Sequence, residues 1–158
     1  MMRRGIALLA LAEIACFLLL SRLDFSFSLF HIYESLIYAA IAFMLFYSES
    51  QWACMLGILA PSGWILLAVV TGAFGEPMRE ITRLLHVEPP NYAVQILGGV
   101  VSVLSLAMIA LCAYCWEHEF AKAGKGLRTF VVSLGIVTTY YGVLALWFWR
   151  SAVRAQHG

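Results

Sequence analysis

The sequence predicts an all-α integral membrane protein: one domain, residues 1–158, built as a bundle of about five transmembrane helices. Of the 158 residues, 63% are apolar and only 12% are charged, with a mean hydropathy of +0.87. A small soluble domain leaves too much surface in water to use so many apolar residues. The apolar residues also fall into separate runs of about 20, the length that crosses the hydrocarbon core. In none of these runs do apolar and polar residues alternate as in the strands of a membrane β-barrel, so helices are expected.

The five expected spans follow the apolar runs in chain order. They are residues 5–21, 27–47, 53–74, 92–116 and 129–149. The first run resembles a signal peptide because two arginines precede it, but no small-residue cleavage site follows cleanly. We therefore interpret it as a retained first helix.

The longest connection joins the third and fourth spans and predicts a short interfacial helix at about residues 77–87. Pro77 suits the first turn of such a helix, and Pro89 follows its end. Apolar and charged side chains fall on opposite sides, as in a helix that lies in the membrane interface. An ordinary polar loop is the alternative. Lysine and arginine do not orient the bundle, because five lie on each side of the expected membrane.

Polar side chains recur inside the second expected span, in the stretch LFHIYESLIY. His31 and Glu34 lie one helical turn apart, and Ser35 and Tyr38 continue the same stripe. Glu13 interrupts the first span. A charged residue at mid-bilayer costs about 2.5–3.5 kcal/mol on insertion scales, so such residues are candidates for function.

A turn centred between Leu23 and Asp24 places Glu13 level with Glu34, with His31 one turn nearer the loop. Burial favours the neutral form of a carboxyl, whereas a nearby imidazolium favours the charged form. A group in that balance exchanges protons near physiological pH, as a relay or a coupled transporter requires. We therefore predict a binding or proton-handling site. Its members are Glu13, His31, Glu34, Ser35 and Tyr38.

Two other interpretations of these residues remain open. One is a purely structural role, in which the side chains form hydrogen bonds between helices. Each such bond stabilises a membrane protein by about 0.6 kcal/mol. The other is a metal site at Glu13, His31 and Glu34. The four-helix di-metal pattern needs paired Glu-x-x-His helices, and the chain has a single reversed copy.

A second candidate site consists of cysteines at one expected membrane surface. Cys112 and Cys115 close the fourth span as a Cys-x-x-Cys pair, and Cys54 begins the third span on the same side. Such a pair is capable of redox chemistry when the protein lowers the pKa of a thiol. Cysteine is also a small apolar filler of helix interiors, so plain packing is the alternative.

The sequence favours a carrier, a channel or a small-ligand-binding protein over an enzyme. It has no nucleophile elbow, phosphate loop, Walker motif or HExxH motif. The net charge of +1, with no basic patch, argues against nucleic acid as a partner. The alternatives are a structural subunit of a larger membrane complex and a membrane-embedded redox or lipid-modifying enzyme. Membrane lipids are expected partners, the short chain predicts a homo-oligomer or membership of a complex, and the sequence assigns no cofactor.

Overall fold

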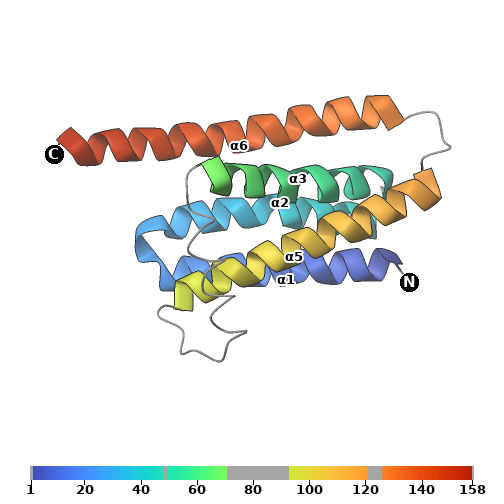
Figure 1. Ribbon diagram of the computed structural model, residues 1–158, viewed down its shortest axis with the longest axis horizontal. Helices are drawn as coiled ribbons and strands as arrows, with labels where there is room; N and C mark the ends of the chain where they lie inside the picture. The colour runs from blue at the N-terminus through green and yellow to red at the C-terminus, as the bar shows by residue number, and fades with distance from the viewer. Residues whose placement is uncertain (1, 48–49, 71–92, 121–125, 158) are drawn as a thin grey trace.

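The computed structural model describes residues 2–47, 50–70, 93–120 and 126–157. Its five long helices are α1 (Met2–Leu23), α2 (Ser28–Phe46), α3 (Ser50–Val70), α5 (Ala93–Cys115) and α6 (Gly126–His157). All five are long and apolar enough to cross a membrane (Figure 1). The helical fold and the five candidate spans are thus confirmed, while the interfacial helix predicted at residues 77–87 lies outside the described residues.

Two shorter turns complete the described chain. The 3-10 turn η1 (Phe25–Phe27) joins α1 to α2, and the π-helical turn η2 (Trp116–Phe120) extends α5. The Asp24 side chain caps η1 by accepting a hydrogen bond from the backbone N–H of Phe27 at 3.4 Å. This cap stabilises the turn between the end of α1 and the start of α2.

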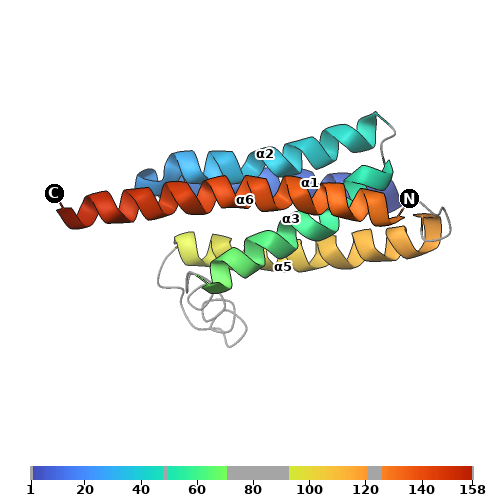
Figure 2. The ribbon, with the colours of Figure 1, turned by 90° about the horizontal axis from the view of Figure 1, so that it is seen from above.

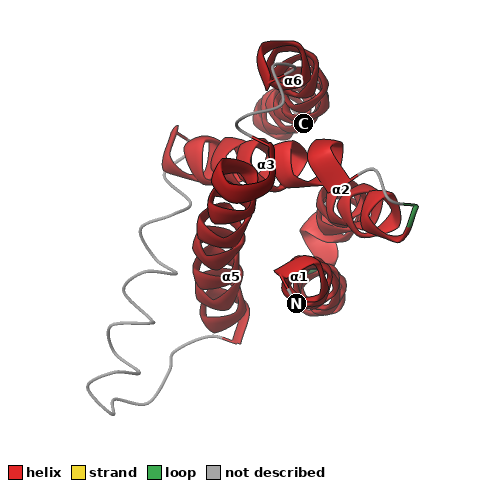
Figure 3. Ribbon diagram, turned by 90° about the vertical axis from the view of Figure 1, so that its right-hand side faces the viewer, coloured by secondary structure: helices red, strands yellow, loops and turns green. Residues whose placement is uncertain are grey.

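Four helices form a ring, and α6 lies outside it. α1 packs against α2 and α5, and α3 packs against the same two helices. Seen end-on, these four surround a common interior, whereas α6 lies on the outer side of α3 (Figure 3). The view from above also shows α6 running along the bundle beside α2 and α3 (Figure 2).

Helices that follow one another in the chain run antiparallel, so the bundle has two distinct ends (Figure 1). Met2 and Cys115 lie at the end that we call the amino-terminal end. Asp24 and Ala93 lie at the opposite end, which we call the η1 end.

The interior and the exterior of the ring are both apolar. Side chains with no exposed surface fill the interior; they include Ile6, Ala10, Phe17, Tyr38, Ile41, Val101 and Met108. Large apolar side chains also cover the outside of every helix; they include Leu8, Phe43, Leu66, Leu106 and Leu146. Apolar surface on this scale is expected where the surrounding solvent is lipid rather than water.

Two glycines of α3 allow its neighbours to approach closely. A Cβ atom on Gly57 would lie 2.5 Å from the Sγ of Cys112 on α5. A Cβ atom on Gly63 would lie 2.9 Å from a ring carbon of Tyr141 on α6. Small residues at such contacts bring helix backbones together and increase van der Waals packing. α3 therefore packs closely against both α5 and α6.

Candidate functional site

The turn between α1 and α2 sets which residues face each other across the two helices. α1 ends at Leu23 and α2 begins at Ser28, so the turn is centred about two residues later than predicted. In an antiparallel pair, a turn that is centred two residues later shifts the residue opposite any given position by about four residues, which is one helical turn. Glu13 consequently lies level with Tyr38 rather than with Glu34. The difference arises because α1 continues to Leu23, two residues beyond its predicted end, and α2 begins at Ser28, one residue later than predicted.

The first polar cluster, which we call the outer cluster, consists of Asp24, His31, Glu34 and Trp64. The Nδ1 of His31 lies 2.9 Å from Oε2 of Glu34, and its Nε2 lies 3.9 Å from Oδ2 of Asp24. The indole N–H of Trp64 on α3 donates to Oε1 of Glu34 at 3.1 Å. Both carboxyl oxygens of Glu34 are thus engaged, and the residue joins α2 to α3.

The outer cluster leads inward from the η1 end. The exposed fraction of the side chain falls from 29% at Asp24 to 18% at His31 and 10% at Glu34. The polar atoms of successive residues in this series lie 3.9 Å apart between Asp24 and His31 and 2.9 Å apart between His31 and Glu34. The cluster therefore connects the η1 surface to the interior.

The second polar cluster, which we call the inner cluster, surrounds Glu13 at the centre of the ring. Glu13 has no exposed surface, and its Oε1 accepts a hydrogen bond from Oγ of Ser105 on α5 at 2.9 Å. Its Oε2 and the hydroxyl of Tyr38 have no hydrogen-bond partner among the described residues. The Tyr38 hydroxyl lies beside Ser105 and Tyr141 and interacts electrostatically with Glu13.

The unpaired atoms of the inner cluster are unusual for a buried site. Leaving a buried donor or acceptor without a partner costs about 1–3 kcal/mol. A carboxyl in apolar surroundings therefore favours its neutral, protonated form, in which the added O–H is itself a hydrogen-bond donor. The inner cluster can chemically hold a proton, or a small polar ligand, between Glu13 and Tyr38.

Phe17 separates the two clusters. It lies one helical turn after Glu13 on α1 and is fully buried. Its ring stacks on Tyr38 with centroids 5.6 Å apart and on His31 with centroids 6.4 Å apart, and it meets Trp64 edge-on at 6.1 Å. Because these neighbours belong to both clusters, a hydrocarbon ring fills the space between them.

The predicted site residues are not all brought together. Ser35 joins neither cluster, because its hydroxyl donates to the backbone carbonyl of Ile32 in its own helix at 2.7 Å. The metal interpretation of Glu13, His31 and Glu34 is not supported either. Among the residues that the structure describes, no three His, Cys, Asp or Glu side chains come together as a metal site.

Four members of the site were not predicted from the sequence: Asp24, Ser105, Trp64 and Phe17. Asp24 stands in the polar turn after the first span, where a charged residue is ordinary. Ser105, with Ser102 three residues before it, marks a polar face of α5, and this signal was available. Trp64 and Phe17 carry no such signal, since an aromatic residue in an apolar span is ordinary core. Only the packing of α1, α2 and α3 gives these two a place in the site.

The candidate cysteines lie at the amino-terminal end. Sγ of Cys54 on α3 donates to Sγ of Cys115 on α5 at 3.3 Å, so the closest contact joins two helices rather than the two members of the Cys-x-x-Cys pair. Cys112 lies one turn further into the ring, and all three are free, fully buried thiols. Apolar burial favours the thiol over the reactive thiolate.

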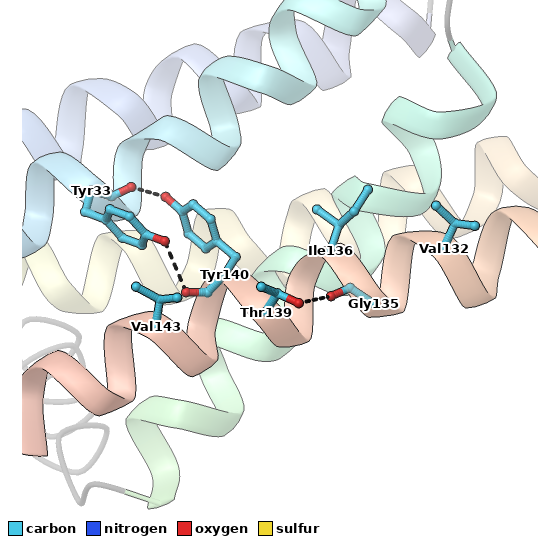
Figure 4. Close-up of a pocket in the computed structure, with 7 residues that line it drawn as sticks. All are labelled: Tyr33, Val132, Gly135, Ile136, Thr139, Tyr140 and Val143. Atoms are coloured by element: carbon cyan, nitrogen blue, oxygen red, sulfur yellow. Dashed lines mark hydrogen bonds between the residues drawn. The ribbon is translucent and has the colours of Figure 1, made fainter.

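α6 leans on α2 through a reciprocal pair of tyrosines (Figure 4). The hydroxyl of Tyr33 donates to the backbone carbonyl of Tyr140 at 3.3 Å, and the hydroxyl of Tyr140 donates to the backbone carbonyl of Tyr33. Their rings stack with centroids 4.4 Å apart. Beside them lies an open groove of about 550 Å³. It is lined by Tyr33, Val132, Gly135, Ile136, Thr139, Tyr140 and Val143.

Comparison of the chain with protein-family models, with curated proteins and with solved structures found no match. The two polar clusters are therefore the features of the molecule from which a function is inferred.

Proposed function

We propose that this chain is a multi-pass integral membrane protein whose buried carboxyl, Glu13, takes up and releases a proton as the working site of a small carrier or ligand-binding protein. The observation that carries the proposal is the burial of the Glu13 side chain and its incomplete hydrogen bonding. It is fully buried among candidate membrane spans, with Oε1 bonded to Ser105 and Oε2 without a partner among the residues that the structure describes. Ionisable groups inside the membrane are costly and usually functional.

The contrast between the two glutamates supports a proton-handling role for Glu13 over a purely structural one. A carboxyl that serves as helix glue is expected to have both oxygens satisfied by neighbouring helices. Glu34 meets this expectation through His31 and Trp64. Glu13 does not, because one of its oxygens has no described partner.

A structural subunit of a larger membrane complex is the second candidate function. The bonds of Glu34 favour it, since they fix α2 against α3. α6 also exposes large apolar side chains that a partner subunit or lipid would cover, including Val131, Ile136, Val143 and Leu146. In either case we propose that the protein works as a homo-oligomer or within a larger complex.

The two enzyme alternatives have weaker support. The contact between Cys54 and Cys115 is compatible with thiol redox chemistry, but both side chains are fully buried in apolar surroundings. A lipid-modifying enzyme needs a lateral groove beside a carboxylate. The groove along α6 is lined by no acidic residue.

Proton flux into proteoliposomes tests the proposal. The protein is reconstituted with a pH-sensitive dye inside, and a potassium diffusion potential drives protons inward. We expect flux with the native chain and its loss with Glu13→Gln, because the amide keeps an oxygen for Ser105 but cannot bind or release a proton.

The matched control is Glu117→Gln, which makes the same chemical change on an exposed residue of η2. This variant should conduct like the native chain. Absence of flux from the native chain, or full flux from Glu13→Gln, would contradict a proton-carrying role for Glu13. Size-exclusion profiles and helical content of each variant establish that the comparison is between folded proteins.

A further inference from the structure

We propose that protons reach Glu13 from the η1 end of the bundle alone, by way of Asp24, His31 and Glu34, and that Phe17 is the gate on this path. The inference rests on the proposed function and adds to it a direction of entry and a barrier. It also gives a specific role to a residue that carries no polar group.

The outer cluster has the chemistry of a relay. Neutral imidazole accepts a proton at one ring nitrogen and releases one from the other. In His31 the two nitrogens face different carboxyl groups, with Nδ1 2.9 Å from Glu34 and Nε2 3.9 Å from Asp24. The longer gap exceeds a direct hydrogen bond, so transfer across it requires a small movement of either side chain or a water molecule beside the pair. A proton that enters beside Asp24 thus has a route to Glu34.

The opposite half of the ring offers no such route. Between Glu13 and the amino-terminal end, the described interior is filled by apolar side chains and thiols. These side chains include Ile6, Ala10, Leu56, Met108 and Cys112, which are 0–2% exposed. In the described part of the ring, no buried carboxyl or imidazole lies on that side of Glu13. In the described residues, the interior therefore holds carboxyl and imidazole groups toward the η1 end of Glu13 and apolar side chains and thiols toward the other end.

Phe17 interrupts the path at one point. No hydrogen bond between described residues joins the outer cluster to the inner cluster, and the Phe17 ring packs against Tyr38 of one and against His31 and Trp64 of the other. Tyr38 follows Glu34 by one turn of α2 and interacts with it electrostatically. A shift of the Phe17 ring would thus open the way from Glu34 to Tyr38.

Hydrogen–deuterium exchange of the Glu13 carboxyl tests the path without requiring transport. The protein in lipid nanodiscs is transferred to deuterated buffer, and infrared spectroscopy follows the shift of the C=O band of the neutral buried carboxyl. The band is assigned to Glu13 by its loss in Glu13→Gln. A native spectrum without such a band would overturn the inference.

Two variants form a matched pair, because each removes a large buried side chain about one helical turn from the Glu13–Ser105 contact. Phe17 lies toward the η1 end and Met108 toward the amino-terminal end. We expect Phe17→Ala to speed the exchange at least about tenfold, equivalent to about 1.36 kcal/mol of barrier. Met108→Ala should change the exchange rate by no more than about twofold, which corresponds to a change in the barrier well below about 1.36 kcal/mol. Equal acceleration by both, or a larger effect of Met108→Ala, would overturn the one-sided path. If Phe17→Ala does not fold, Phe17→Leu is expected to give a smaller acceleration of the same sign.

A third variant tests the relay itself. In the Phe17→Ala background, His31→Phe should slow the exchange again, because phenylalanine fills the same space with no nitrogen to pass a proton. An unchanged rate would exclude His31 from the path. Native protein with no flux but with this pattern of exchange rates would refute the carrier and leave the gate intact. Proton flux that depends on Glu13, together with equal exchange rates in Phe17→Ala and Met108→Ala, would refute the gate and leave the carrier intact.

Discussion

The contact between Gly57 and Cys112 makes the packing of α3 against α5 testable by one added methyl group. In Gly57→Ala the new Cβ would lie 2.5 Å from Sγ of Cys112, about 1 Å closer than non-bonded heavy atoms normally approach. Overpacking of this kind costs about 1–3 kcal/mol. Alanine in place of glycine within a helix returns about 0.5–1 kcal/mol. The two ranges leave a net loss of stability of about 0–2.5 kcal/mol, and the complete burial of Cys112 favours the upper half of that range.

The size of the loss depends on whether the Cys112 thiol can move. Rotation about one bond would carry Sγ away, but Cys112 is completely buried and Met108 also lies 3.8 Å from the added carbon. Removal of the sulfur should relieve the overlap directly, so Cys112→Ala should compensate for much of the effect of Gly57→Ala. A double-mutant cycle should then give a coupling of about 0.5–3 kcal/mol.

Reversible unfolding in mixed micelles, followed by tryptophan fluorescence during titration with a denaturing detergent, measures these free energies. Gly135→Ala is the matched control, because a Cβ at Gly135 meets nothing within 4 Å. The control should be neutral or slightly stabilising. Native stability in Gly57→Ala, or strictly additive effects of Gly57→Ala and Cys112→Ala, would refute the close approach of α3 and α5.

Two further predictions concern the interhelical contacts at either end of the ring. Trp64→Phe removes the donor to Oε1 of Glu34 and should cost about 1–3 kcal/mol in the same unfolding assay, whereas in a Glu34→Leu background it should cost much less. Diamide, which takes up the two thiol hydrogens, should join Cys54 and Cys115 in a disulfide that lowers the intact mass by two hydrogens and vanishes in Cys54→Ser. Peptide mapping that finds Cys112 in the bridge instead would contradict the observed pairing.

The asymmetry of the ring interior bears on how a proton carrier would work. One-sided access suits the loading of Glu13 from the η1 end, and delivery to the other side would require the apolar side chains around Met108 to part. The groove along α6 and the reciprocal bonds of Tyr33 and Tyr140 lie outside the ring. They affect how α6 is held and do not form part of the path.

The sequence by itself determined the helical class and the five candidate spans. An apolar run of about 20 residues is a local property, and a helix satisfies every backbone group within its own segment. The sequence also singled out Glu13, His31 and Glu34, because a polar side chain in an apolar run is visible without any knowledge of its neighbours. The interaction of His31 with Glu34 followed as well, since the two are one helical turn apart.

Only the tertiary structure decided which of these groups meet. α1 continues two residues beyond its predicted end and α2 begins one residue later, which changes the register of the two helices by about one helical turn. Glu13 therefore lies level with Tyr38, and Phe17 comes to lie between the two clusters. The partners of the carboxyls, Ser105 and Trp64, stand 92 and 30 residues away in the chain. Such pairings depend on where each helix stops and on which faces pack together. The periodicity of one helix predicts neither the helix ends nor the packing partners. It indicates the direction in which a side chain points but not which residue lies opposite to it.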